Sequence, residues 1–264
     1  RLSVLANTGI VPVPVGNAVQ TFCSADAPTV ADLIASGNNN WYSTISSAVP
    51  LDPTEPLIDG ENYFSTTVDP PCESADRFEV TVVFEEPSNT GTSGNIDICE
   101  VDISSIGTVD LIDGLTDNPE LNGTWTGPIT TTNGSTGTVD ITTMTVSGSP
   151  YVFTYTLDPG NSCEISSSTV TINILDSANA GSDASLDICR NDTNTVDLFT
   201  ILGGTPETGG TWSPTLDSGS GVFDPSIDPP VTYTYTVSGT PPCGDASASV
   251  TVTISPEPDA GSDE

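Results

Sequence analysis

The cysteines and tryptophans of this chain recur in a fixed order, and this order constrains the fold more than any other feature. The six cysteines of the 264 residues fall into three pairs, and each pair brackets one tryptophan. The pairs are Cys23 and Cys72, Cys99 and Cys163, and Cys189 and Cys243, around Trp41, Trp125 and Trp212. Internal self-similarity of this kind indicates repeated structural units. The sequence therefore predicts three modules, although its length alone would suggest one or two domains.

Strict alternation of apolar and polar residues flanks the second cysteine of each pair. The strand before it is clearest in the second and third modules, where one face carries Tyr151, Phe153, Tyr155 and Leu157, or Val231, Tyr233, Tyr235 and Val237. A closing strand follows it, formed by Phe78-Val80-Val82, Val170-Ile172-Ile174 and Val250-Val252-Ile254. Period-two alternation marks half-buried antiparallel strands, and short strands between Gly/Pro turns indicate a β-sandwich. We expect an all-β tandem array of three antiparallel β-sandwich modules.

The repeats also set the expected module boundaries, which are residues 18–88, 89–176 and 177–256. Residues 1–5 resemble the closing strand that begins at Arg77, and residues 259–263 repeat residues 179–183. We therefore interpret residues 1–17 as the end of a preceding module with its linker, and residues 257–264 as a linker to a following one. Alternatively, residues 1–17 are the first strand and linker of the first module.

An even number of regularly spaced cysteines in small modules indicates disulfide bonds and an oxidising compartment. Six cysteines allow fifteen pairings, but the repeat pattern favours one disulfide in each module, namely 23–72, 99–163 and 189–243. Each bond would close a loop of about 50–65 residues and contribute about 4 kcal/mol on the chain-entropy model. The alternative is free buried thiols.

The charge of the chain excludes several classes of function. There are 36 acidic residues against three basic ones, with no Lys and no His, so the formal net charge is −33. Such a chain has almost no cations to replace the counterions of nucleic acid, and an anionic membrane surface would repel it. Without His, a Ser-His-Asp triad and a His-ligated zinc site are impossible. We expect no enzymatic activity, no nucleic-acid partner and no direct membrane insertion, since no stretch approaches the length of a membrane span.

Three segments resemble tandem Ig-like modules of very large surface adhesins of Bacteroidetes, of the type that SprB-type gliding adhesins carry. The first contains QTFCSADAPTVADL and LIDGENYF, the second VDLIDGL, GTWTGP and YVFTYTL, and the third VDLFTILGGTPETGGTWSP, YTYTVSGTPPC and ASVTVTI. The resemblance covers almost the whole chain. It departs from antibody-type Ig domains because the second cysteine lies in a turn after the Tyr-rich strand.

The resemblance implies Ig-like sandwiches and export by a type IX secretion system to the cell surface or the medium. It implies that the chain is a non-enzymatic, repetitive section of a surface adhesin. This section would form part of a filament that presents an adhesive region. The most specific role that the resemblance implies is gliding motility. The partners of this section would be neighbouring Ig-like modules of the same longer chain, with surface glycans or proteins as further candidates. Two alternatives remain: a carbohydrate- or protein-binding module, and a spacer inside a secreted multidomain enzyme.

Calcium is the one candidate cofactor. Asp176, Asp183, Asp187 and Asp192 flank the second linker, and Ca²⁺ takes six to eight oxygen ligands. The sequence lacks the recognised calcium-loop patterns. The alternative is a solvated acidic surface that keeps the protein soluble.

Two further candidates concern surface chemistry. Trp41 and Tyr42 follow three asparagines and are the best candidates for an exposed aromatic ligand contact, the alternative being core packing. Asp176-Ser177-Ala178 resembles the O-glycosylation sequon of exported Bacteroidetes proteins, which makes Ser177 a candidate glycosylation site; an ordinary linker is the alternative.

Overall fold

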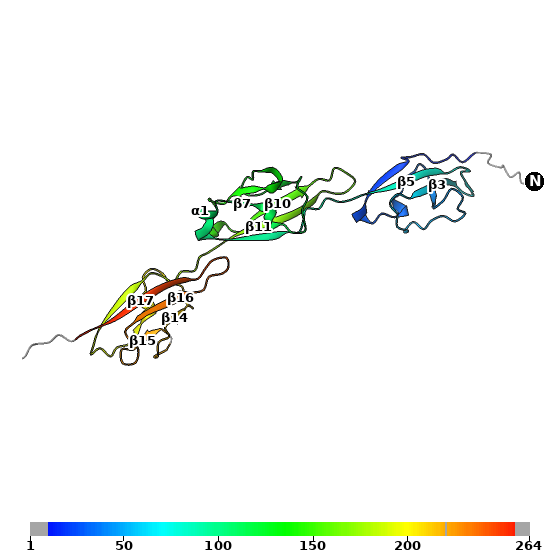
Figure 1. Ribbon diagram of the computed structural model, residues 1–264. Coiled ribbons are helices and arrows are strands. Elements are labelled where there is room, and N and C mark those ends of the chain that lie inside the picture. Colours follow the sequence, from blue (N-terminus) through cyan, green and yellow to red (C-terminus); the bar gives the residue numbers. More distant parts are fainter. Residues whose placement is uncertain (1–9, 220, 257–264) are drawn as a thin grey trace, which may run out of the picture. The chain divides into compact units, whose positions relative to one another are not determined.

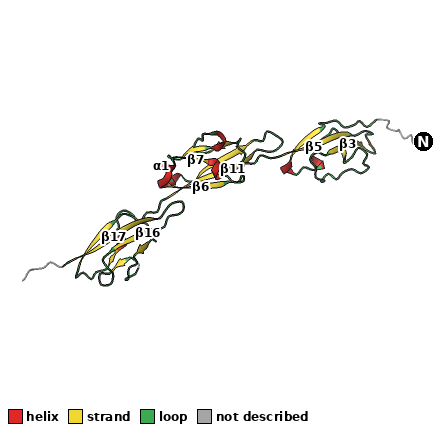
Figure 2. Ribbon diagram, in the orientation of Figure 1, coloured by secondary structure: helices red, strands yellow, loops and turns green. Residues whose placement is uncertain are grey.

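The computed structural model of the chain describes residues 10–219 and 221–256, and it contains three separate groups of strands (Figure 1). The expectations for residues 1–5 and 259–263 lie outside the described residues. Strands and loops dominate, and the helices are short (Figure 2). The one α-helix of the described residues is α1, Ile103–Ile106, so the expectation of an all-β chain is confirmed.

The first group, called the first sandwich, contains five strands. They are β1 Val19–Cys23, β2 Asn39–Tyr42, β3 Asn62–Asp69, β4 Cys72–Glu73 and β5 Phe78–Glu85. The sheet order is β1-β5-β3-β2, and β4 pairs with β3. The segment around 3₁₀ helix Val30–Asp32 covers the sheet, because Val30, Leu33 and Leu57 pack in one core with residues of β2, β3 and β5.

The second sandwich has two sheets. Its strands are β6 Gly94–Cys99, β7 Thr108–Asp110, β8 Thr124–Thr126, β9 Thr138–Asp140, β10 Tyr151–Leu157 and β11 Ser166–Leu175. One sheet has the order β6-β11-β10-β8, and the other consists of β7 and β9.

The third sandwich repeats this arrangement. Its strands are β12 Ala184–Cys189, β13 Val196–Asp197, β14 Thr211–Ser213, β15 Val222–Phe223, β16 Thr232–Val237 and β17 Ala246–Ser255. One sheet has the order β12-β17-β16-β14, and the other consists of β13 and β15. The chain is thus a tandem array of three Ig-like sandwiches, while the boundaries given above remain predictions.

The alternating strands supply the cores, as their pattern predicts. In β10 the side chains of Phe153, Tyr155 and Leu157 are buried, and in β16 those of Tyr233, Tyr235 and Val237 are buried. The intervening threonines lie on the other face of each strand. The aromatic faces of β10 and β16 therefore belong to the cores. The Trp125 ring packs on Tyr155 with 4.8 Å between ring centroids, and the Trp212 ring packs on Tyr235 with 5.1 Å.

The first strand of each sandwich pairs with the last strand in parallel, which differs from the expected purely antiparallel arrangement. The pairs are β1 with β5, β6 with β11 and β12 with β17. Parallel strands end at the same edge of a sheet. Consequently Cys23 lies opposite Glu85, Cys99 opposite Leu175, and Cys189 opposite Ser255, each at the end of a last strand.

Candidate functional site

Two disulfide bonds join successive sandwiches. Cys23 bonds Cys163 with a Cα–Cα distance of 4.7 Å, and Cys99 bonds Cys243 with a distance of 5.0 Å. We call the cysteine that ends the first strand of a sandwich a strand-end cysteine, and the cysteine before its last strand a turn cysteine. Each bond links the strand-end cysteine of one sandwich, Cys23 or Cys99, to the turn cysteine of the next, Cys163 or Cys243. The chain forms two compact units, and each unit contains one of these bonds.

The predicted pairing of 23–72, 99–163 and 189–243 is therefore wrong, as is the expectation of one disulfide in each module. Cys72 and Cys189 are free and exposed. The cause is the parallel first strand. Cys23 lies beside the end of β5, whereas Cys72 precedes its start. Eight extended residues span roughly 25 Å, and a disulfide requires Cα atoms about 4.4–6.8 Å apart.

Direct contacts surround the first disulfide. The Cys163 Sγ atom lies 3.3 Å from the carbonyl oxygen of Glu85, the last residue of β5. The backbone N–H of Ser162 donates to the Glu85 carboxylate at 2.6 Å, and Asn161 donates to the Glu86 carbonyl at 3.2 Å. Hydrogen bonding by the side chain and the backbone N–H of Ser162 lowers the pKa of the Glu85 carboxyl. The turn before β11 is thus held against the end of β5.

The second disulfide repeats this geometry. The Cys243 Sγ atom lies 3.7 Å from the carbonyl oxygen of Leu175, the last residue of β11. The residue after each strand-end cysteine also bonds to the linker: Ser24 donates to the Glu86 carboxylate at 2.8 Å. At the second position the roles are exchanged, because the Ser177 hydroxyl donates to Glu100 at 3.0 Å. We call each such set, disulfide plus linker contacts, a junction.

The linkers themselves dock on the sandwich that follows. The Asn89 side chain accepts from the Gly91 N–H at 2.9 Å, and Asn179 accepts from Gly181 at the same distance. Gly91 and Gly181 have φ of 72° and 84°, in the region that favours glycine. Thr92 forms an isolated antiparallel β-bridge with Thr116 of the second sandwich, and Ser182 forms one with Gly203 of the third. The Gly/Ser-rich linkers are therefore ordered extensions of the following sandwich.

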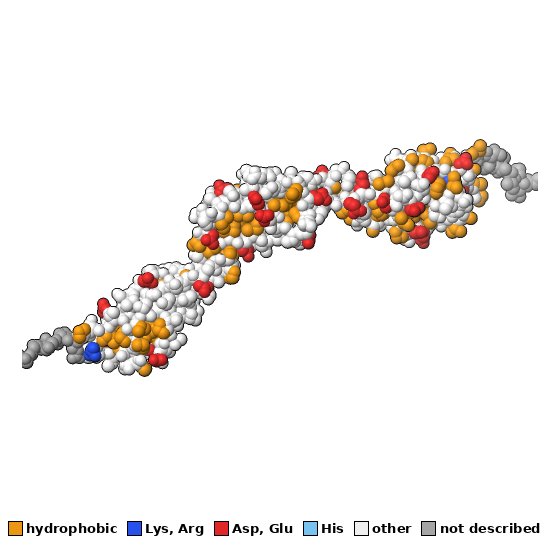
Figure 3. All heavy atoms as spheres, in the orientation of Figure 1, with side chains coloured by type: hydrophobic (Ala, Val, Ile, Leu, Met, Phe, Trp, Pro, Cys, Tyr) orange, Lys and Arg blue, Asp and Glu red, His pale blue; other side chains and the backbone are white. Residues whose placement is uncertain are grey.

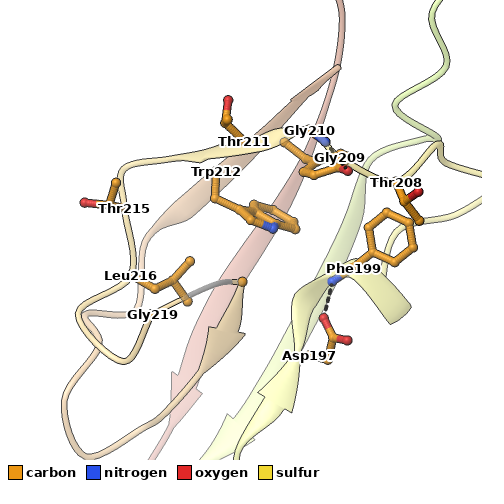
Figure 4. Close-up of a pocket in the computed structure, with 12 residues that line it drawn as sticks. Asp197, Phe199, Thr208, Gly209, Gly210, Thr211, Trp212, Thr215, Leu216 and Gly219 are labelled. Atoms are coloured by element: carbon orange, nitrogen blue, oxygen red, sulfur yellow. Dashed lines mark hydrogen bonds between the residues drawn. The ribbon is translucent and has the colours of Figure 1, made fainter. Parts of the chain in front are cut away.

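A pocket of about 630 Å³ opens on the third sandwich (Figure 4). Trp212, on β14, and Leu216 lie on one side of it, and Phe199 lies on the other. Asp197 accepts the Phe199 N–H at 3.0 Å, which holds the turn that carries the phenyl ring. Three threonines also belong to the lining, namely Thr208, Thr211 and Thr215. An aromatic lining beside one carboxylate is suited to a small ligand that combines an apolar face with a polar group. No pattern in the sequence predicted this pocket.

The loop that contributes Leu216, Gly219 and Gly221 to the pocket is organised by Asp228, which is 3% exposed. Its carboxylate accepts from the backbone N–H groups of Asp217 at 2.6 Å and Asp224 at 2.8 Å, and from the Ser218 hydroxyl. Burial alone would raise the pKa of Asp228, but these hydrogen bonds outweigh it, so that the pKa lies below its usual value. Charge-assisted bonds of this kind are strong.

The expectation of an exposed aromatic contact at Trp41 and Tyr42 is wrong, and the structure agrees with its alternative, core packing, because these side chains are only 7% and 4% exposed. Trp41 packs in the core of the first sandwich. The Tyr42 hydroxyl donates to Glu73 at 2.8 Å, and the Arg77 guanidinium lies 3.6 Å from the ring centroid. Hydrogen bonds from Thr66 and Tyr42 lower the pKa of Glu73, whereas burial and Glu73 raise that of Tyr42. The contacts of Tyr42 with Glu73 and Arg77 thus join parts of the first sandwich to one another.

The four carboxylates considered for calcium do not come together. Asp183 accepts from the backbone of Ser249 at 2.7 Å, Asp187 bonds the Thr253 hydroxyl, and Asp192 accepts from Asn194 at 2.8 Å. Asp176 is exposed in the linker. Among the described residues, no group of three or more His, Cys, Asp or Glu side chains could hold a metal ion. The hydrogen-bonding partners of Asp183, Asp187 and Asp192 lie on neighbouring strands and turns.

Ser177 is half-buried, and its hydroxyl is engaged by Glu100. Its glycosylation remains a prediction. In the described part of the chain, no helix is long and apolar enough to cross a membrane.

No protein-family model and no curated protein sequence matches the chain. Among solved structures it is similar to an I-band fragment of titin, I67–I69, with a TM-score of 0.39 and 9% identity over 84% of this chain and 90% of that one. It is also similar to the insect immune protein hemolin, with a TM-score of 0.32 and 11% identity over 92% and 76%. A third is the four N-terminal Ig domains of Dscam1, with a TM-score of 0.31 and 15% identity over 75% and 55%.

Proposed function

We propose that this chain is a non-catalytic structural section of an extracellular surface adhesin, in which disulfides between successive Ig-like sandwiches hold the array together. The observation that carries the proposal is the pair of junctions, Cys23–Cys163 and Cys99–Cys243. A disulfide placed between sandwiches does more than stabilise one core, because it restricts the movement of one sandwich against the next. Disulfides persist in oxidising compartments, which supports a place outside the cell.

The two disulfide loops overlap between Cys99 and Cys163. A force applied to the ends of the chain would be carried across both bonds, and the segments inside the loops would not be fully extended while the bonds remain. Loops of this length contribute about 5 kcal/mol each on the chain-entropy model. Resistance to extension is the property that a load-bearing section of an adhesin needs.

The acidic surface supports the same role. The net charge is −33, and acidic side chains are dispersed over the visible faces rather than gathered in one patch (Figure 3). Like charge of this size keeps a protein soluble and discourages self-association. In the narrowest form of the proposal, the adhesin moves along the surface of gliding bacteria.

The experiment that tests the proposal is live-cell imaging of the source organism with a fluorescent antibody fragment raised against residues 18–255. Label that moves along crawling cells would support a gliding adhesin, and stationary label would support a static one. Label found only in the medium, together with a catalytic block in the same polypeptide, would contradict the adhesin proposal and favour an enzyme spacer.

A second candidate function is ligand binding, which the pocket at Trp212 and Phe199 favours. A glycan array with the labelled chain would test it, followed by titration of any hit with tryptophan fluorescence. Trp212→Phe should weaken binding and remove the signal, whereas Trp125→Phe, the matched change in the second sandwich, should leave both unchanged. The absence of any hit, or equal effects of the two substitutions, would remove this function.

A further inference from the structure

The two free cysteines occupy the same positions as the bonded ones. Cys189 ends β12 opposite Ser255, as Cys23 ends β1 opposite Glu85 and Cys99 ends β6 opposite Leu175. Cys72 lies between the two antiparallel strands β3 and β5, as Cys163 lies between β10 and β11 and Cys243 between β16 and β17. The sequence Pro-Pro-Cys occurs at both Cys72 and Cys243. Cys189 is thus a strand-end cysteine, and Cys72 is a turn cysteine.

Each formed junction uses one cysteine of each kind, the strand-end cysteine of one sandwich and the turn cysteine of the next. This rule leaves the strand-end cysteine of the third sandwich and the turn cysteine of the first without a partner in the chain. Exposure follows the same division: the four bonded cysteines are buried, at 1–8% exposure, whereas Cys72 and Cys189 are exposed. A hollow lined by Arg190, Thr253 and Ile254 opens beside Cys189.

We propose that Cys189 and Cys72 are complementary halves of a further junction, Cys189 bonding the turn cysteine of a following sandwich and Cys72 the strand-end cysteine of a preceding one. The partner is an Ig-like sandwich of this same construction, supplied either by the same polypeptide or by a second copy of this chain. Such head-to-tail contacts generate rings where the rotation between copies closes and linear assemblies where it does not. The inference rests on the proposed role of the junctions in joining sandwiches.

The bond forms by thiol–disulfide exchange with a low-molecular-weight disulfide such as oxidised glutathione. One protein thiolate attacks the glutathione disulfide and releases one reduced glutathione. The second protein thiolate then attacks the mixed disulfide and releases the other. Two protein thiols are oxidised to one protein disulfide, two glutathione molecules are formed, and the two thiol protons pass to them.

Two single variants test the second copy as partner. C72S keeps the free strand-end cysteine, and C189S keeps the free turn cysteine. Each is incubated alone, and both are mixed in equal amounts, in a glutathione redox buffer, followed by alkylation, non-reducing electrophoresis and peptide mapping. We expect a dimer in the mixture, joined by Cys189 and Cys72, with little dimer in either variant alone. Equal dimer formation in all three samples would indicate unspecific oxidation and overturn the proposal.

A tethered sandwich tests the same polypeptide as partner. Residues 184–256 are appended after Asp263, because residues 259–263 repeat the linker that leads into β12. We expect loss of the free Cys189 thiol and a bond from Cys189 to the turn cysteine of the appended sandwich. A bond in this arm alone identifies a neighbour in the polypeptide, and a bond in the mixture identifies a second copy. Failure in both arms overturns the inference without bearing on the cellular location that imaging measures.

Discussion

Cys99 and Cys243 are covalently joined although 144 positions separate them along the chain. They meet because Cys99 lies at the end of a strand parallel to β11, and β11 leads directly to the third sandwich through the linker at residues 176–183. The same relationship joins Cys23 and Cys163 across the preceding linker. The disulfides of this chain therefore connect sandwiches, and stabilise each one only indirectly.

Pulling on the two ends of the chain should reveal the overlapping loops. Fully reduced and unfolded, the chain can extend to about 950 Å, whereas the shortest covalent path through both disulfides extends to only about 400 Å. Single-molecule force spectroscopy on the oxidised chain should therefore reach its limit at less than half the reduced length. The C72S/C189S double variant is the control, and its length should match that of the unmodified oxidised chain. Equal lengths before and after reduction would contradict load-bearing disulfides.

Replacing Asp228 with Asn should destabilise the third sandwich at neutral pH by about 2–3 kcal/mol, because charge-assisted hydrogen bonds from part-buried donors to the buried carboxylate are weakened. The folded pKa of Asp228 is below its unfolded value of about 3.8. The stabilising effect is thus present above that value and is lost as the pH falls through the folded pKa. Denaturant melts should show wild type and variant separated at pH 7 and converging below pH ~3.8; a constant difference would contradict the role of the carboxylate.

Gly181→Ala should loosen the second linker. The added Cβ would lie 2.5 Å from the Gly203 carbonyl oxygen, in addition to the unfavourable positive φ. Gly209→Ala is a matched control, since Gly209 has a φ of 96° but no heavy atom within 4 Å of the new Cβ. We expect Gly209→Ala to lower the free energy of unfolding by about 1 kcal/mol, and Gly181→Ala to lower it by more. Urea unfolding measures both values. Equal losses at the two positions would show that the linker does not dock as described.

Tyr235→Phe should lower the free energy of unfolding by about 1–2 kcal/mol. The Tyr235 hydroxyl donates to the Glu207 carbonyl and accepts from the Gly210 N–H, both at 2.8 Å, and phenylalanine loses both bonds. Tyr155 makes the equivalent bonds to Glu120 and Gly123, so Tyr155→Phe should have a similar effect on the second sandwich. Tyr151 is the control, because its hydroxyl accepts from the Thr145 N–H at 3.0 Å and donates to the Thr145 carbonyl at 3.4 Å in an exposed position. Water can replace these bonds, so Tyr151→Phe should change the unfolding free energy less than the other two substitutions. Calorimetry of the three variants measures these losses. Similar losses for Tyr155→Phe and Tyr235→Phe would show that the two sandwiches share this geometry, and a loss in only one of them would contradict it.

Period-two alternation correctly identified the core strands at Tyr155 and Tyr235, because side chains on alternate positions of a strand must face opposite sides. The repeated Cys-Trp-Cys order likewise predicted the three-sandwich class. Alternation says which face of a strand is buried, but it does not say which strand lies beside it or in which direction.

The errors follow from that limit. The sequence gives no sign that β1 runs parallel to β5, and this single pairing moves Cys23 to the opposite end of the sheet from Cys72. At Trp41 the sequence left two alternatives open, because the preceding asparagines suggested an exposed loop. Residues 39–42 instead form a strand, and Trp41 packs in the core, as the second alternative predicted. The pocket at Trp212 depends on the loops around it, which alternation does not describe.

The most direct test of the central claim is peptide mapping of the oxidised chain under non-reducing conditions, with free thiols alkylated before digestion. We predict cross-linked peptides that contain Cys23 with Cys163 and Cys99 with Cys243, and alkylated peptides that contain Cys72 and Cys189. Cross-links of Cys23 with Cys72, Cys99 with Cys163 and Cys189 with Cys243 would place every disulfide inside one sandwich and contradict the junctions.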